Sequence, residues 1–264
     1  MSKNHHSKLV ARRLVALFGV VVAAALVFAL AACGGTSASS TSTGSGSTSA
    51  ASSSSSSDDK VITVGASPSP HAEILEQIKP TLEAEGYTLN IVEYSDYVQP
   101  NEALAQGDLD ANYFQHKPYL DNYNSENGTD LVSVAAIHFE PMSIYSNKHD
   151  SLTDIPDGAK IAVPSDATNE ARALLLLQDN GILTLKDGAG LDATANDIAD
   201  NPHNVQLVET EAANVARTLD DVDFAVVNGN YALSAGLDTS KTLASEAADS
   251  EAAQTYANII ACRD

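Results

Sequence analysis

The sequence lacks tryptophan, contains only two cysteines and has few positive charges for its length. Lysine and arginine total 14 residues against 35 aspartate and glutamate residues, which gives a formal net charge of −21. A nucleic-acid-binding protein needs a basic surface to neutralise phosphates, so this balance argues against nucleic acid as a partner. Hydrophobic residues make up 44% of the chain, an ordinary content for a folded protein, and this excludes disorder throughout.

Long hydrophobic runs are also scarce. Only the segment Leu14–Ala32 is long enough to reach across a bilayer, which excludes a channel or transporter with several spans. Lys3, Lys8, Arg12 and Arg13 precede this segment, and small residues end it. Basic residues before an apolar run and small residues after it are the layout of a secretory signal.

The apolar segment leads into the tetrad Leu30-Ala31-Ala32-Cys33, which resembles the lipobox of bacterial lipoproteins. In that motif the cysteine thiol is lipidated, and the cysteine becomes the first residue after cleavage. We therefore predict a signal peptide over residues 1–32 and lipidation at Cys33. The alternative is an ordinary signal sequence or signal anchor with an incidental cysteine. Two acyl chains anchor a protein stably, so the predicted location is the extracytoplasmic face of the cell membrane.

A tether is predicted between the anchor and the globular part. Residues 34–57 are all Gly, Ser, Thr or Ala, a composition that cannot bury enough apolar surface to offset the entropy of ordering. Residues 33–57 therefore form the lipidated end and a flexible tether with a root-mean-square reach of about 25 to 30 Å. With Cys33 lipidated, Cys262 has no partner in the chain, and no intramolecular disulfide is expected.

From Asp58 onward, β-branched runs alternate with apolar residues at helical spacing. The predicted strands are residues 61–65, 88–94, 109–114, 131–138, 160–163, 205–208 and 224–227. The predicted helices are residues 72–86, with Pro80 expected to kink or split it, and 101–106, 117–124, 169–179 and 212–219. This alternation indicates two α/β units. Ligands in such folds bind beyond the carboxyl ends of the strands, here at residues 66–71, 114–118, 165–169 and 228–231.

The helix that follows the strand at 160–163 has the features of an anion site. A cap-forming residue such as Asp166 precedes it, and Arg172 lies in its first turn. Free N–H groups and the helix dipole favour an anion at that end, and a guanidinium matches a carboxylate with two hydrogen bonds. From this segment alone, Arg172 either binds a ligand carboxylate or pairs with an acid of the protein such as Glu170 or Glu102.

Ring-bearing side chains concentrate in the segment Tyr113-Phe-Gln-His-Lys-Pro-Tyr119. Side chains alternate along a strand, so Tyr113 and Phe114 point to opposite faces and only one enters a cleft. Phe114 is nearer the strand end and is the expected one. His116 is either a ligand-binding residue or a structural histidine whose nitrogens are hydrogen-bonded within the protein.

Signatures of catalysis and of metal binding are absent from the sequence. It contains no Gly-x-Ser-x-Gly elbow, no P-loop and no dinucleotide fingerprint. The histidines form no HExxH pair, there is no CxxC, and His138 with Glu140 offers at most two ligands. We therefore predict a protein that is not an enzyme, needs no cofactor and has no metal site. An esterase or peptidase within an α/β fold is the catalytic alternative.

Three stretches resemble one family. Residues 110–120, 161–178 and 227–232 look like the signature stretches of the methionine-binding NlpA-type lipoproteins, the substrate-binding components of methionine ABC importers. The resemblance runs from about Val61 to Asp264. It implies an α/β fold with two lobes, of the periplasmic-binding-protein type (type II-like), and a ligand cleft between the lobes.

The resemblance also implies lobe boundaries. Residues 58–140 and 229–264 would form lobe 1, and residues 141–228 would form lobe 2. The chain departs from the family at Ser69, where a glycine is expected, and at Cys262, where an aliphatic residue is usual. Family members continue into a further helix beyond the point where this chain stops, so a truncated C-terminus is one interpretation.

The resemblance assigns roles to single residues. Arg172 would bind the ligand carboxylate, with Asn169 and Asn228 on the carboxylate and amino group. The residues implied around the ligand side chain are Tyr97, Phe114, His116 and Tyr119. Ring edges suit an unbranched, polarizable thioether.

The function implied by the resemblance is capture of methionine by a membrane-anchored protein. The two lobes would close over the amino acid, and the loaded form would dock on an ABC permease whose ATPase supplies the energy. Another apolar amino acid or a methionine-containing dipeptide is the alternative ligand, and the sequence does not distinguish L- from D-methionine. A surface interaction lipoprotein is the alternative of a different class.

Overall fold

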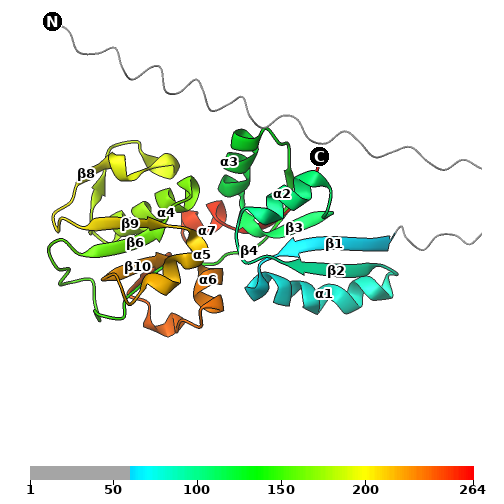
Figure 1. Ribbon diagram of the computed structural model, residues 1–264, viewed down its shortest axis with the longest axis horizontal. Helices are drawn as coiled ribbons and strands as arrows, with labels where there is room; N and C mark the ends of the chain where they lie inside the picture. Colours follow the sequence, from blue (N-terminus) through cyan, green and yellow to red (C-terminus); the bar gives the residue numbers. More distant parts are fainter. Residues whose placement is uncertain (1–59) are drawn as a thin grey trace, which may run out of the picture. The chain divides into compact units, whose positions relative to one another are not determined.

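The computed structural model describes residues 60–264, which form two lobes, each built around a five-stranded sheet (Figure 1). The predicted signal peptide, the lipidation site Cys33 and the tether lie outside the described residues. Between residues 60 and 264, no helix is both long and apolar enough to cross a membrane.

The strands of lobe 1 are β1 (Val61–Ala66), β2 (Thr88–Glu93), β3 (Ala111–His116), β4 (Val132–His138) and β12 (Asn258–Cys262). Their order across the sheet is β2-β1-β3-β12-β4. β1 pairs in parallel with β2 and β3, whereas β12 runs antiparallel between β3 and β4. A strand that follows the whole of lobe 2 in sequence therefore lies inside the sheet of lobe 1.

The helices of lobe 1 are α1 (Glu73–Ala84), α2 (Gln99–Gln106) and α3 (Lys117–Asn127), and a short π-helical turn, η2 (Pro68–Ala72), leads into α1. α3 is capped by His116, whose Nδ1 accepts a hydrogen bond from the N–H of Tyr119 at 3.2 Å. Pro80 was predicted to kink or split the first helix, and it does not split it, because α1 continues through it. Proline removes one hydrogen bond from the helix, and the remaining bonds and the packing of α1 hold it together.

The strands of the lobe 2 sheet are β5 (Ser143–Tyr145), β6 (Lys160–Pro164), β9 (Gln206–Thr210), β10 (Phe224–Val227) and β11 (Ala244–Ser245). Their order is β11-β5-β10-β6-β9. A separate two-stranded sheet pairs β7 (Thr184–Leu185) with β8 (Ile198–Asp200). The helices of lobe 2 are α4 (Ala167–Asp179), α5 (Ala212–Val215) and α6 (Gly229–Ser234), whereas α7 (Glu251–Thr255) lies between β11 and β12. Single 3₁₀ turns are η3 (Gly190–Asp192), η4 (Ala195–Asp197), η5 (Ala216–Thr218) and η6 (Thr239–Lys241).

The last part of the chain departs from the predicted lobe boundary at residue 229. β11 pairs with β5 in the sheet of lobe 2, and Tyr231 and Ala232 of α6 belong to a lobe 2 core cluster. Only β12 joins lobe 1, so residues 229–245 are corrected to lobe 2. The sequence does not mark this change, because the two residues of β11 are too few to show an alternating pattern.

The chain passes between the lobes at two crossings. We call residues 139–142, between β4 and β5, the first crossing, and residues 246–257, between β11 and β12, the second crossing. Each lobe has its own core: Ala173, Leu174 and Leu177 of α4 are fully buried in lobe 2, and Leu104 of α2 is fully buried in lobe 1. Side chains that face each other between the lobes are therefore supported by two separate hydrophobic cores.

Candidate ligand-binding site

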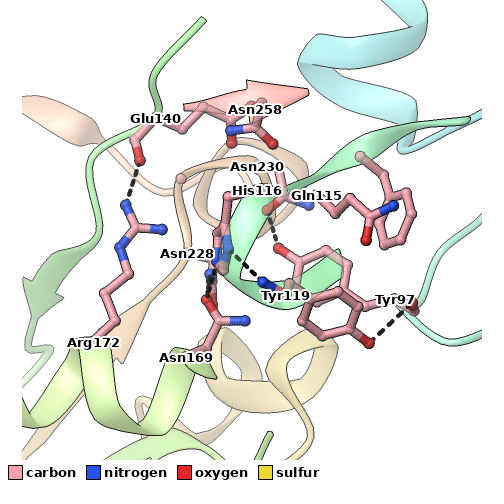
Figure 2. A pocket seen from close by; sticks show the side chains of 12 residues that line it. Tyr97, Gln115, His116, Tyr119, Glu140, Asn169, Arg172, Asn228, Asn230 and Asn258 are labelled. Carbon is pink, nitrogen blue, oxygen red and sulfur yellow. Dashed lines mark hydrogen bonds between the residues drawn. The ribbon is translucent and has the colours of Figure 1, made fainter. Parts of the chain in front are cut away.

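A small cavity, with about 20 Å³ of free space, lies between the lobes, beyond the carboxyl ends of β3, β6 and β10 (Figure 2). This space suffices for about one water molecule, so a ligand enters only when the lobes or the lining side chains move apart. The lining residues come from both lobes, from Glu140 on the first crossing and from Asn258, the first residue after the second crossing. They are Tyr97, Phe114, Gln115, His116, Tyr119, Glu140, Asn169, Arg172, Asn228, Gly229, Asn230 and Asn258.

The structure brings together all of the residues that the sequence proposes for ligand binding. They are Tyr97, Phe114, His116, Tyr119, Asn169, Arg172 and Asn228. Gln115, Glu140, Gly229, Asn230 and Asn258 also line the cavity and were not predicted. Gln115, Gly229 and Asn230 lie in the segments 114–118 and 228–231, where ligand binding was expected, but they were not singled out within them. Glu140 and Asn258 carry no such signal, because only the fold places them there.

Arg172 of α4 is buried and has a protein partner that was not predicted. Its Nε donates to Oε1 of Glu246 at 2.7 Å, and its Nη2 donates to Oε2 of Glu246 at 2.5 Å and to the carbonyl oxygen of Glu140 at 2.9 Å. The expected partners Glu170 and Glu102 do not form this pair. Within residues 60–264, the remaining nitrogen Nη1 donates no hydrogen bond to the protein.

Glu246 connects the two crossings to α4. Besides its ion pair with Arg172, its Oε2 accepts a hydrogen bond from the N–H of Met142 on the first crossing at 2.8 Å. Both charged side chains are buried, with 4% exposed for Arg172 and 7% for Glu246. The ring of Tyr256 lies against the guanidinium, 4.3 Å from its centroid. The ion pair therefore fixes the guanidinium at one edge and leaves its other edge at the cavity.

Asn169 and Asn228 form one hydrogen-bonded unit. Nδ2 of Asn228 donates to Oδ1 of Asn169 at 2.8 Å, and Nδ2 of Asn169 donates to Oδ1 of Asp166, the N-cap of α4, at 2.8 Å. The carbonyl oxygen Oδ1 of Asn228 is buried and has no hydrogen-bond partner in the described part of the chain. A buried unpaired acceptor costs about 1 to 3 kcal/mol, so this atom is suited to a donor on a ligand.

His116 is fixed by bonds at both ring nitrogens. Because Nδ1 accepts from Tyr119, Nε2 carries the proton and donates to Oδ1 of Asn169 at 3.2 Å. Burial, and then the charge of Arg172, lower the pKa of His116 to about 3. The ring is therefore neutral at neutral pH. The two interpretations of His116 from sequence do not exclude each other, since it caps α3 and also lines the cavity.

Aromatic rings form one wall of the cavity, opposite Arg172 (Figure 2). The ring centroid of Tyr97 lies 5.8 Å from those of both Phe114 and Tyr119. The hydroxyl of Tyr97 donates to Oδ1 of Asn230 at 2.5 Å, and burial raises the pKa of Tyr97 well above its usual value. As strand alternation predicts, Phe114 faces the cavity, whereas Tyr113 lies in the lobe 1 core.

Residues 62–264 match the family described as NlpA lipoprotein. The chain belongs to the NlpA lipoprotein family. The resemblance drawn from the three sequence stretches is therefore confirmed.

Two curated relatives and one solved structure illustrate the match. Membrane lipoprotein TpN32 of Treponema pallidum is 42% identical over 201 residues, which cover 76% of this chain and 74% of that protein. D-methionine-binding lipoprotein MetQ of Salmonella typhimurium is 46% identical over 172 residues, 64% of this chain and 63% of that protein. The structure of a nutrient binding protein from Burkholderia cenocepacia bound to methionine is 47% identical, with a TM-score of 0.73, and covers 76% of this chain and 84% of that one.

These comparisons bear on the fold and on the class of protein. The predicted α/β fold with two lobes is confirmed by the two sheets and by the structural relatives of this NlpA family member. The family is one of binding lipoproteins and not of enzymes. The alignment with MetQ of Salmonella typhimurium spans just under two thirds of that protein, at 63% of its length.

Proposed function

We propose that this protein is a membrane-anchored, extracytoplasmic lipoprotein that captures methionine and delivers it to an ABC permease. One observation carries the proposal: the cavity presents a cationic donor, Nη1 of Arg172, and an unpartnered acceptor, Oδ1 of Asn228, beside a wall of rings. An α-amino acid offers the complementary groups, with a carboxylate, an ammonium group and a side chain on one carbon. Relatives named as D-methionine-binding lipoproteins support methionine as the ligand.

The polar end of the ligand is assigned to three residues. Among the residues that the structure describes, Arg172 is the only lysine or arginine that lines the cavity, so the ligand carboxylate accepts from its Nη1. Asn228 receives the ammonium group at Oδ1, and Asn169 keeps the amide of Asn228 in that orientation. A charge-assisted hydrogen bond of this kind is about twice as strong as a neutral one.

The side chain of the ligand is assigned to the ring wall of Tyr97, Phe114, His116 and Tyr119. A thioether sulfur near a ring edge gains about 0.3 to 1.5 kcal/mol. Because His116 is neutral, this end of the cavity carries no charge that would favour an acidic side chain. An unbranched side chain such as that of methionine would be crowded less by these rings than a β-branched one.

Transport follows from closure of the lobes at the two crossings. The cavity lining comes from both lobes, so a bound ligand would favour the closed form. The loaded, closed form would dock on the permease, and the partner ATPase would supply the energy. The lipid on Cys33 and the tether would keep the protein at the membrane while it collects ligand.

Calorimetric titration of the mature protein tests the ligand assignment. L-methionine, D-methionine, leucine and a glycine-methionine dipeptide are titrated in turn, and one of the methionine enantiomers is expected to bind most tightly. A thermal-shift measurement gives a second readout, since a ligand at 100 times its Kd adds about 2.7 kcal/mol of stability. Tighter binding of leucine or of the dipeptide would replace methionine with that ligand. No binding of any of the four would favour the surface interaction lipoprotein.

The variant Cys33→Ala tests the anchor. Both lipid attachment and lipoprotein processing need the thiol, so the variant should appear in the medium or remain as unprocessed precursor. Cell fractionation with mass spectrometry of the N-terminus gives the result, and Cys262→Ala is the control expected to stay anchored. If Cys33→Ala is processed normally and stays with the membrane, the lipobox interpretation is wrong.

The variants Phe114→Ala and Tyr97→Ala test the ring wall. Each should weaken methionine binding by at least about tenfold, or about 1.4 kcal/mol, since burial of one apolar side chain contributes about 1.5 to 3 kcal/mol. Tyr87→Ala is the matched control, because Tyr87 is 38% exposed and lies outside the cavity. Circular dichroism checks the fold of each variant. Unchanged affinity in both would make these rings structural.

A further inference from the structure

A second polar cluster lies behind the ligand cavity, formed by His71, His138 and Glu140. We propose that it binds a divalent first-row transition metal ion, with zinc as the best match. The sequence predicted no metal site, because it showed only the pair of His138 and Glu140. His71 comes from η2, and only the fold brings it to that pair. The proposal does not depend on which ligand the cavity takes.

The three side chains converge on one carboxylate oxygen. Oε1 of Glu140 lies 2.6 Å from Nε2 of His138 and 3.4 Å from Nε2 of His71. One ligand atom from each of the three residues lies within 4.8 Å of the others. The side chain of His71 is fully buried, and those of Glu140 and His138 are 11% and 21% exposed. The cluster is therefore preformed and largely shielded from water.

One of the two measured separations agrees with tetrahedral coordination. Zinc binds histidine nitrogen at about 2.0 to 2.1 Å, so ligand atoms around it lie about 3.3 Å apart. The 3.4 Å between His71 and Glu140 matches that value, whereas the 2.6 Å between His138 and Glu140 is a hydrogen bond, so these two side chains must separate by about 0.7 Å to admit an ion. Two imidazole nitrogens with one carboxylate suit zinc, whereas calcium and magnesium prefer oxygen ligands alone.

The residues around His138 hold it as in known metal sites, whereas Nδ1 of His71 has no hydrogen-bond partner in the described part of the chain. The hydroxyl of Tyr113 lies 2.5 Å from Nδ1 of His138. Its oxygen can accept a hydrogen bond from the Nδ1–H group when Nε2 binds an ion. The amide oxygen of Asn258 lies 3.0 Å from Nε2 of His71, close enough to serve as a fourth ligand.

The position of the cluster suggests what a bound ion would do. Glu140 lies on the first crossing, and Asn258 is the first residue after the second crossing. Both would be tied to His71 of lobe 1 by the ion. The backbone of Gly229 lies close to Glu140, since a Cβ atom added at residue 229 would come within 2.8 Å of the Cβ of Glu140. An ion here would restrict the movement of the two crossings and raise the melting temperature.

The test uses the mature protein, purified without a histidine tag and stripped with a chelator. Calorimetric titration with zinc chloride should give one saturable site per chain and a higher melting temperature. His138→Gln should weaken this site by at least about tenfold, because loss of a residue that only supports a metal ligand already costs about 10- to 100-fold in metal affinity. Glu140→Gln should do the same. His138 is chosen over His71 because it is partly exposed, so its replacement disturbs the core less.

His149→Gln is the matched control. His149 also pairs with an acid, Asp223 at 3.4 Å, and is 25% exposed, but no third ligand is grouped with this pair in the part of the chain that the structure describes. It should keep the zinc site. If zinc instead binds weakly at many sites, and binds equally to the wild type and to His138→Gln, the binding comes from the acidic surface and the proposal is overturned. Methionine titration of the stripped protein is a separate readout, so failure of the metal site and failure of the proposed function are distinguishable.

Discussion

Replacing Arg172 with alanine should weaken methionine binding at least about a hundredfold. Loss of one member of a buried charge pair costs about 3 to 5 kcal/mol, and each 1.4 kcal/mol is about tenfold in affinity. No other lysine or arginine among the cavity-lining residues can take over the ligand carboxylate. Calorimetric titration of the purified variant measures the loss.

Arg172→Lys is the matched variant, and it should recover only part of the affinity. An ammonium group cannot donate to Glu246, the carbonyl of Glu140 and a ligand in the planar geometry that the guanidinium provides. Circular dichroism must show that both variants are folded, because Arg172→Ala also leaves Glu246 buried without its cation. A loss of less than about threefold in a folded Arg172→Ala protein would remove the carboxylate site from the proposal.

Replacing Glu246 with alanine should destabilise the ligand-free protein much more than removal of an exposed ion pair. The variant leaves the guanidinium of Arg172 buried without a counter-charge, and it removes the acceptor for the N–H of Met142. Breaking a buried pair in this way lowers the free energy of unfolding by about 3 to 5 kcal/mol. Urea unfolding of the ligand-free protein, monitored by circular dichroism, measures the change.

Asp121→Ala is the control for that experiment. Asp121 forms an ion pair with Lys117 on α3, but both side chains are more than half exposed, at 57% and 56%. Solvent-exposed pairs contribute about 0.2 to 1 kcal/mol, so the control should unfold close to the wild type. Equal losses of unfolding free energy in the two variants would mean that burial does not increase the contribution of the Glu246 pair to stability.

The sequence predicted the parts of the fold that have a local signal. Apolar spacing located the long helices, and β-branched runs located seven of the ten strands of the two large sheets. The strands β5, β7, β8 and β11 were not predicted, because segments of two or three residues show no alternation. β12 was also missed, because its five residues, Asn-Ile-Ile-Ala-Cys, do not alternate between apolar and polar. The candidate site was predicted where local motifs and the family resemblance coincide, as at Phe114 and Arg172.

The missed features depend on contacts between distant residues. Glu246 lies 74 positions from Arg172, and nothing in its own segment marks it as the partner. Glu140 and Asn258 reach the cavity only because the chain crosses between the lobes at those points. Local sequence carries little information on such pairings, since the side chains that decide them belong to different elements.

The place of β12 between β3 and β4 has a consequence for how the protein is made. During synthesis and export, the first strands of lobe 1 emerge early, but their sheet stays divided until the chain has passed through lobe 2. Lobe 2 can fold first, because all five strands of its sheet are contiguous in sequence order between residues 143 and 245. Pairings between residues so far apart form slowly. Lobe 1 should therefore remain open to secretion machinery and to proteases until β12 inserts.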